Sequence, residues 1–214
     1  MMMNRDKLGF WVKFVSIFLA VVFLLSFIFA GVGSSGLNYN IFDLISGNNN
    51  NQQQDGQTIS PQEEIKSAEK QVKENPKDAE AIKTLAARYI QQNRLDDAAS
   101  VLEKGRKDAP KDAEIPLFLG QVYGQQAQSA PQDKQKDLYK KSGDTLAEAT
   151  RKDPKNADAY YLAGQSYDQA GEPSQAIKYW NGYLDLEPNG QYAKAVKDRI
   201  SALLKGGETT GATQ

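Results

Sequence analysis

The side chains best suited to acid–base catalysis or metal binding are scarce in this sequence. Its 214 residues include no Cys and no His, which removes thiolate nucleophiles, imidazole catalysis and the usual zinc ligand sets. Two pairs of neighbouring carboxylates remain, Glu63 with Glu64 and Asp96 with Asp97. Both pairs lie at predicted turns or helix starts, where acidic side chains cap and solvate the helix. The sequence therefore predicts no catalytic residue, no metal site and no cofactor.

Charge and length restrict the function further. The chain has 26 basic and 27 acidic residues, and those in its C-terminal part are interspersed rather than gathered into runs. A nucleic-acid partner is therefore not expected. An enzyme or a small-molecule binder would need a deep pocket with converging polar groups, and the sequence offers none. The length suits one folded domain with an anchor or a tail.

An apolar segment near the N-terminus is long enough to cross a bilayer. Residues 14–30 carry no charge, and apolar residues extend this run back to Leu8. Roughly 23 helical residues reach about 34 Å, which matches the bilayer core. We therefore predict a transmembrane anchor over residues 8–31. A cleaved signal peptide is the alternative, since Gly31 and Gly33 suit processing, although the apolar core exceeds the usual length of about 7 to 15 residues.

Basic residues are distributed unevenly about this segment. Arg5, Lys7 and Lys13 precede its core, whereas residues 31–62 contain no Lys or Arg. The positive-inside rule then predicts a cytoplasmic N-terminus over residues 1–7 and an exported C-terminal domain. We expect a single-pass protein of a bacterial cell membrane with its folded domain on the extracytoplasmic side.

Two further segments have the composition of flexible chain. Residues 32–59 are rich in Gly, Ser, Asn and Gln, which is typical of a linker. Residues 205–214 show no apolar periodicity and are predicted to be a disordered tail.

Proline recurs at a nearly regular spacing in the rest of the chain. Pro76, Pro110, Pro154 and Pro188 each end a helical pattern, and their intervals are 34, 44 and 34 residues. Such a period indicates an array of helical pairs. The ten additional residues lie around Pro131, where we expect two helices lengthened by a turn or more each. They form either a partner-specific ridge or a tolerated surface extension.

Between successive prolines we expect two helices, and small residues on the first of them lie beside aromatic and other bulky residues. The pattern consists of Ile82, Leu85, Ala86, Tyr89, Ala98, Leu102 and Gly105, then Leu119, Gly120, Tyr123, Leu146 and Ala149, then Tyr160, Ala163, Gly164, Tyr167, Gly171, Ala176, Trp180 and Tyr183. It resembles the tetratricopeptide repeat family, with Pro116 and Ser142 as departures from the family pattern.

The resemblance implies an all-α solenoid of helical hairpins. We place the domain at 60–204, with repeats at about 77–110, 111–154 and 155–188. A capping helix is expected to begin at Ser60 and Pro61, which are a suitable N-cap and first helical residue. A second capping helix is placed at 190–204.

Tetratricopeptide proteins hold extended peptides or partner helices on an inner surface lined by the first helix of each repeat. By repeat position, the resemblance places twelve residues there: Lys83, Ala87, Ile90, Gln91, Leu117, Gln121, Gly124, Gln125, Tyr161, Gln165, Asp168 and Gln169. The glutamines and the tyrosine can bond a peptide backbone without requiring charge on the ligand. Of the positions by which some relatives bind chaperone C-terminal carboxylates, only Lys83 matches, so that ligand is not expected.

The resemblance thus implies a non-enzymatic protein-interaction module, an adaptor or a chaperone-like subunit at the membrane. Its layout is similar to that of the ancillary tetratricopeptide subunit of the bacterial Sec translocon. A dedicated scaffold of one envelope complex, for cell-wall synthesis or cytochrome c maturation, is the alternative. The partner's identity and the oligomeric state are left open.

Overall fold

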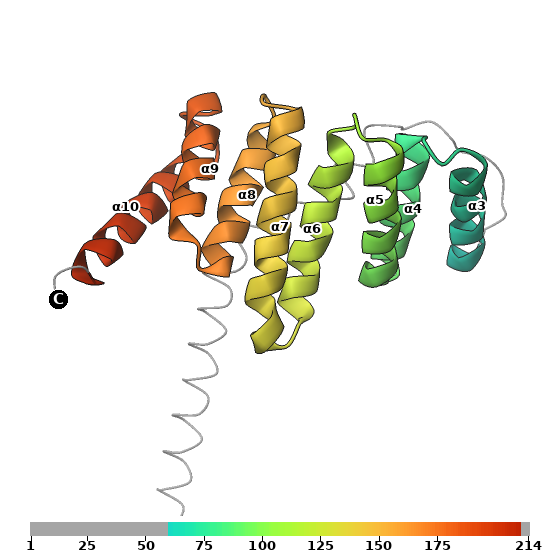
Figure 1. Ribbon diagram of the computed structural model, residues 1–214, viewed down its shortest axis with the longest axis horizontal. Coiled ribbons are helices and arrows are strands. Elements are labelled where there is room, and N and C mark those ends of the chain that lie inside the picture. The colour runs from blue at the N-terminus through green and yellow to red at the C-terminus, as the bar shows by residue number, and fades with distance from the viewer. Residues whose placement is uncertain (1–59, 211–214) are drawn as a thin grey trace, which may run out of the picture. The chain divides into compact units, whose positions relative to one another are not determined.

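A computed structural model of the protein describes residues 60–210, which form eight α-helices and no β-strand (Figure 1). The prediction of an all-α helical solenoid is confirmed for this part of the chain. The expected cytoplasmic N-terminus, anchor and linker (1–59) lie outside the described residues, as do residues 211–214. Among the described helices, none combines the length and the apolar character that a membrane span requires.

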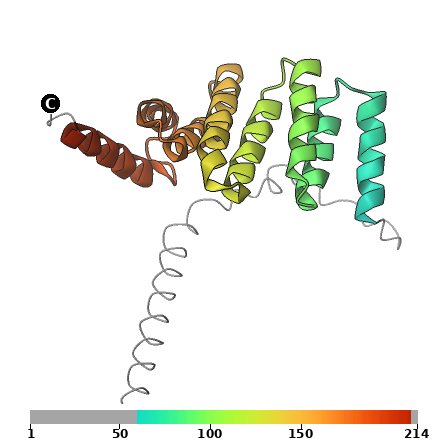
Figure 2. The same ribbon diagram turned by 60° about the horizontal axis from the view of Figure 1, so that its bottom comes forward.

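The helices follow one another as hairpins in a row, which Figure 2 shows from a second direction. A single helix, α3 (Pro61–Glu74), comes first. The three hairpins are α4 (Ala79–Gln91) with α5 (Leu95–Asp108), α6 (Glu114–Ser129) with α7 (Gln132–Lys152), and α8 (Ala157–Ala170) with α9 (Pro173–Leu186). The last helix is α10 (Ala193–Thr210).

Each hairpin begins at a capping side chain two residues after a proline. Asp78 Oδ1 accepts hydrogen bonds from the backbone N–H groups of Glu80 and Ala81, and Asp112 does the same for the start of α6. Asn156 Oδ1 accepts from the N–H of Ala159 at 2.9 Å. Proline ends the preceding helix and the Asp or Asn starts the next one. This local sequence therefore fixes the repeat boundaries.

Small residues bring the two helices of a hairpin together. Gly120 lies ten residues after Pro110, and Leu146 lies eight residues before Pro154. A Cβ atom on Gly120 would come within 2.5 Å of Leu146 Cγ, so the bulky side chain occupies the space that glycine leaves. The corresponding pair in the third hairpin is Gly164 and Trp180, where the distance to Cδ1 would be 2.4 Å.

Tyrosine side chains join successive hairpins. Tyr89 Oη donates to Glu69 of α3 at 2.6 Å, and Tyr167 Oη donates to Asp144 of α7 at 2.7 Å. Tyr123 makes the equivalent bond to Glu103 of α5. Helix α3, which precedes α5 by 34 residues, therefore stacks as the second helix of a hairpin would.

Ser142, a departure from the family pattern, has a partner for its hydroxyl group. Its Oγ donates to the carbonyl oxygen of Gly120 at 2.6 Å and lies 2.9 Å from Ser166 Oγ. The serine is 1% exposed, and a buried hydroxyl needs such partners. A small polar residue therefore serves where the family pattern has alanine.

The ten additional residues lengthen one helix more than the other. Helix α7 has 21 residues against 14 in α5 and α9, whereas α6 has 16 against 13 in α4 and 14 in α8. Our expectation of a turn or more in each helix is thus met by α7 and not by α6. Pro131 holds Ala130 in an extended conformation, which ends α6. Figure 1 shows this hairpin reaching beyond both of its neighbours.

Helix α10 continues past the end that the sequence suggested. We expected the capping helix to stop at residue 204, whereas α10 runs to Thr210. Ala193 and Val196 are buried, and Ile200 and Leu203 pack partly against the core. A nucleated helix gains one backbone hydrogen bond per added residue, so it can extend beyond its last packed side chain.

Candidate functional site on the first helices

The structure divides the twelve predicted groove residues by their exposure. Those that are buried are Lys83, Ala87, Leu117 and Tyr161. Those that are partly exposed are Ile90, Gln121, Gly124, Gln125, Gln165 and Asp168, and the exposed ones are Gln91 and Gln169. The charged, aromatic and amide members of this set have different surroundings, which decide what each can offer a partner.

Lys83 is used inside the domain. It is 4% exposed, and its Nζ donates to Glu80 at 2.6 Å and also to Glu114 at the start of α6. Burial favours the neutral amine, but the hydrogen bonds to Glu114 and Glu80 outweigh it, and the pKa of Lys83 is raised. The lysine therefore stays charged and holds the first two hairpins together.

Asp168 is also paired within the domain. Arg199 of α10 donates to its two carboxylate oxygens from Nε and Nη2, both at 2.9 Å. This bidentate bond raises the pKa of Arg199 and neutralises the carboxylate. Asp168 therefore presents no uncompensated charge to a ligand.

Tyr161 belongs to an aromatic cluster at the third hairpin. Its ring stacks on Tyr192 with centroids 4.1 Å apart and lies 5.5 Å from the ring of Tyr183. Burial raises the pKa of Tyr161 to about 12, and the two neighbouring tyrosines act in the same direction. With Leu117, which is in the same core cluster, Tyr161 gives this region an apolar character.

The glutamines remain as neutral hydrogen-bonding groups. Both amide atoms of Gln121 are shielded from water without a hydrogen-bond partner among the described residues. A partner could bond these atoms only if the side chain turned outward, because neither atom reaches the surface. The amide oxygen of Gln91 accepts from Arg88 at 3.1 Å. Within the described residues, the side chains of Gln165 and Gln169 form no such bond.

The partners that neutralise Lys83 and Asp168 were not predicted from the sequence. Glu114 follows Lys83 by 31 residues, and Arg199 follows Asp168 by the same interval. This interval is slightly shorter than the 34-residue repeat. It therefore connects the first helix of a hairpin to an early or central position of the helix that follows the hairpin. Oppositely charged residues 31 positions apart were the sequence signal that could have revealed these two ion pairs.

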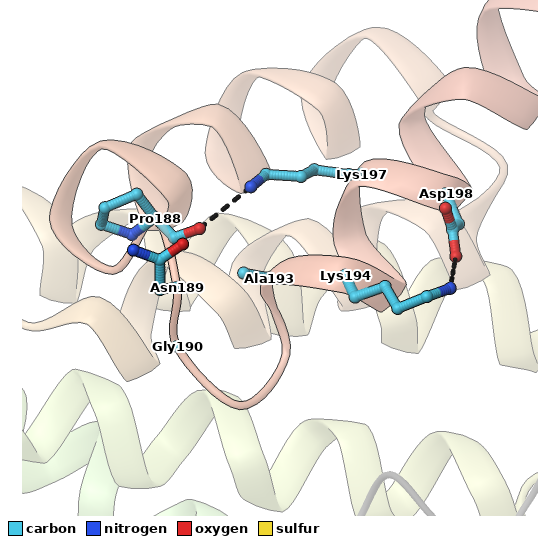
Figure 3. Close-up of a pocket in the computed structure, with 7 residues that line it drawn as sticks. All are labelled: Pro188, Asn189, Gly190, Ala193, Lys194, Lys197 and Asp198. Carbon is cyan, nitrogen blue, oxygen red and sulfur yellow. Dashed lines mark hydrogen bonds and ion pairs between the residues drawn. The ribbon is translucent and has the colours of Figure 1, made fainter.

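A separate hollow of about 350 Å³ lies where α10 begins (Figure 3). Lys197 Nζ donates to the carbonyl oxygen of Pro188 at 2.9 Å, and Lys194 pairs with Asp198 at 2.7 Å. Both lysines are thus engaged, and none of the lining residues belongs to the predicted groove. In the part of the chain that the structure describes, no cluster of three or more acidic side chains is arranged to hold a metal ion.

Comparison with family models identifies the class of protein. Two models described as tetratricopeptide repeat match residues 65–121 and 139–191. Together they cover about half of the chain, and the chain belongs to the tetratricopeptide repeat family. The resemblance predicted from the spaced prolines and small residues is confirmed. The protein is thus a protein–protein interaction module by class.

Solved structures agree with this fold. A crystal structure of MamA protein shares 23% identity, with 68% of this chain and 79% of that chain covered and a TM-score of 0.51. TTC0263, a thermophilic TPR protein in Thermus thermophilus, shares 20% identity over 68% and 74% of the two chains, with a TM-score of 0.50. At these identities the likeness establishes the fold alone. A search of curated proteins found no match.

Proposed function

We propose that the protein is a membrane-tethered interaction module that binds uncharged, extended peptide segments or partner helices along α4, α6 and α8. It acts as an adaptor or a chaperone-like subunit on the extracytoplasmic side. The observation that carries this proposal is the neutrality of the candidate site. Lys83 and Asp168, its two charged members, are both compensated by partners inside the domain.

The remaining polar groups suit a peptide backbone. A carboxamide can donate to a carbonyl oxygen and accept from an N–H, which are the two groups that every extended peptide presents. Gln165 is partly exposed and Gln169 is exposed, and neither side chain has a hydrogen-bond partner among the described residues. A ligand recognised through its backbone and apolar side chains is selected weakly by sequence, as a chaperone-like function requires.

The membrane tether rests on the sequence. The uncharged run 14–30 supplies an anchor, and the basic residues before it orient the anchor with its N-terminus inside. A linker of about 27 residues has a root-mean-square reach of roughly 30 Å as a Gly-rich coil, which would let the domain search the membrane surface. This layout is similar to that of the ancillary tetratricopeptide subunit of the Sec translocon.

Photo-crosslinking tests the candidate site in intact cells. A photoreactive residue replaces Gln165 in the full-length protein, the cells are irradiated, and mass spectrometry identifies the adducts. Exposed Lys178 on α9 is the control position. Many exported precursors at Gln165 support the chaperone-like function, and one dominant envelope protein supports the dedicated scaffold. Adducts no more abundant than at Lys178 exclude the site.

The topology has its own test, because the natural chain contains no cysteine. Asn4→Cys and Gln128→Cys place single thiols before the anchor and on the folded domain. A maleimide that does not cross the inner membrane is expected to label the Gln128→Cys protein in spheroplasts, and the Asn4→Cys protein only after lysis. The reverse pattern contradicts the proposed orientation.

A further inference from the structure

The lengthened second hairpin creates a hollow that a regular repeat would lack. It has a volume of about 510 Å³ and lies between the α4–α5 turn, the end of α6 and the start of α7. Leu95, Leu138 and Pro131 provide apolar surface in its lining. We call this hollow the insertion notch. None of its lining residues belongs to the candidate site on the first helices.

A left-handed turn residue and one hydrogen bond between hairpins shape the insertion notch. Asn93 adopts a left-handed conformation, with φ of 55°, and so turns the chain between α4 and α5. Gln126 Nε2 of α6 donates to Asp96 Oδ1 of α5 at 2.7 Å. This bond connects the second hairpin to the first across 30 residues and occupies one oxygen of Asp96, whose carboxylate keeps its charge.

The basic group of the lining is available. Lys134 is exposed, and its Nζ forms no hydrogen bond or ion pair with any described residue. Two other lysines of α7 differ in this respect, since Lys140 pairs with Glu172 and Lys141 with Glu103. The lining of the insertion notch therefore contains apolar side chains and the carboxylate of Asp96, which accepts a hydrogen bond from Gln126. It also contains the ammonium group of Lys134, which can pair with an anionic group of a partner.

We propose that the insertion notch binds a partner segment in which a large apolar residue lies next to an acidic residue. The apolar side chain packs against Leu95 and Leu138, and its burial provides most of the affinity. The acidic side chain pairs with Lys134, which selects it over a neutral or basic neighbour. The ten-residue insertion thereby gives this array a recognition site of its own, beside the one its repeats supply.

Disulfide tethering can measure such a weak interaction. Gln132→Cys places the single cysteine of the full-length protein beside the notch, on an exposed residue outside its lining. Thiol peptides Cys-Gly-Gly-X-Z-Gly-amide, with X-Z as Leu-Asp, Leu-Asn, Leu-Lys or Ala-Asp, are equilibrated with the protein under β-mercaptoethanol. The concentration that releases half of each peptide reports its relative affinity.

The proposal predicts that Leu-Asp resists release best. A surface ion pair contributes up to about 1 kcal/mol, so Leu-Asp should need about fivefold more β-mercaptoethanol than Leu-Asn, with Leu-Lys lower still. Lys134→Gln should abolish this difference, whereas Lys136→Gln, an exposed lysine outside the lining, should keep it. Ala-Asp should be released more easily than Leu-Asp because it buries less apolar surface.

Equal release of all four peptides would overturn the proposal, as would a preference for Leu-Lys or a Leu-Asp preference that survives Lys134→Gln. A Gln165→Ala variant, altered only in the candidate site on the first helices, should give the same release curves. The notch can therefore be tested whether or not the peptide site on the first helices proves correct.

Discussion

The second and third hairpins pack in the same way over one half of their length and differ over the other. Gly120 with Leu146 and Gly164 with Trp180 lie at matching distances from the prolines that bound each repeat. The ten additional residues of the second hairpin lie between these packed positions, at the turn. None of residues 128–137 is buried.

This difference shows where a helical array tolerates new sequence. Close packing at the proline end fixes the register of each hairpin, because a change there meets a neighbouring hairpin directly. The turn end projects past its neighbours and needs only to keep its backbone hydrogen bonds. New surface, including the insertion notch, can therefore be added there without disturbing the core.

Removing the large member of each pair should destabilise both hairpins, and the third more strongly. Trp180 and Leu146 are 4% and 1% exposed. Trp180→Ala is expected to lower the free energy of unfolding by about 4 kcal/mol and Leu146→Ala by about 3 kcal/mol. Urea titrations followed by far-UV circular dichroism measure both. A loss below about 1 kcal/mol for Trp180→Ala would refute the packing described for the third hairpin.

Adding a methyl group to the small member tests the close approach itself. Gly164→Ala places a Cβ atom 2.4 Å from Trp180 Cδ1, and we expect a loss of about 2 kcal/mol from overpacking. Gly124→Ala is the matched control, since its Cβ would lie 3.6 Å from the nearest neighbour, Ser142 Oγ. Glycine loses more conformational entropy on folding than alanine does, so Gly124→Ala should raise the free energy of unfolding by about 0.5 kcal/mol. Equal changes in the free energy of unfolding for the two variants, measured by the same urea titration, would contradict the close contact between Gly164 and Trp180.

Alkaline pH tests one position at which the two hairpins differ, because Tyr161 of the third hairpin corresponds to Leu117 of the second. The pKa of Tyr161 is raised to about 12, so the folded state binds its proton more tightly than the unfolded state. Its contribution is fully present below about pH 10 and is lost as the pH rises towards 12. Tyr161→Phe should therefore flatten the fall in stability over this window, measured as urea midpoints. An unchanged pH profile would show that Tyr161 does not cause the fall in stability at alkaline pH.

Deleting residues 128–137 restores the regular period and should have the smallest effect. The deletion removes the end of α6, the turn and the start of α7 but no buried side chain, so the free energy of unfolding should change by less than about 1 kcal/mol. The shortened protein should also lose the Leu-Asp preference assigned to the insertion notch. For this comparison the tethering cysteine replaces the exposed Ser100 in both the shortened and the full-length protein. Failure of the deleted protein to fold would mean that the turn end supports the core.

The repeats were predictable because their signals are local. Pro76, Pro110 and Pro154 each precede an Asp or Asn by two residues, and the small residues recur at fixed positions after them. Periodicity, capping and helix termination are properties of short windows, so they require no knowledge of distant contacts. The fold follows from them directly.

The character of the candidate site was less predictable, since it depends on contacts between helices. The sequence suggested Lys83 and Asp168 as groove residues, and the structure pairs them with Glu114 and Arg199, each from the helix that follows the hairpin. The unequal lengthening of α6 and α7 was missed for a related reason. Pro131 marks the turn, but its position does not say how the added residues divide.

The claim that matters most is that the candidate site recognises neutral peptide, and salt dependence tests it most directly. The crosslinking yield at Gln165 is measured in isolated membranes as NaCl rises from about 50 to about 500 mM, which shortens the screening length from about 14 to about 4 Å. Because Lys83 and Asp168 are compensated internally, the yield should change by less than about twofold. A fall of tenfold or more would show that uncompensated charge holds the ligand, and would contradict the account.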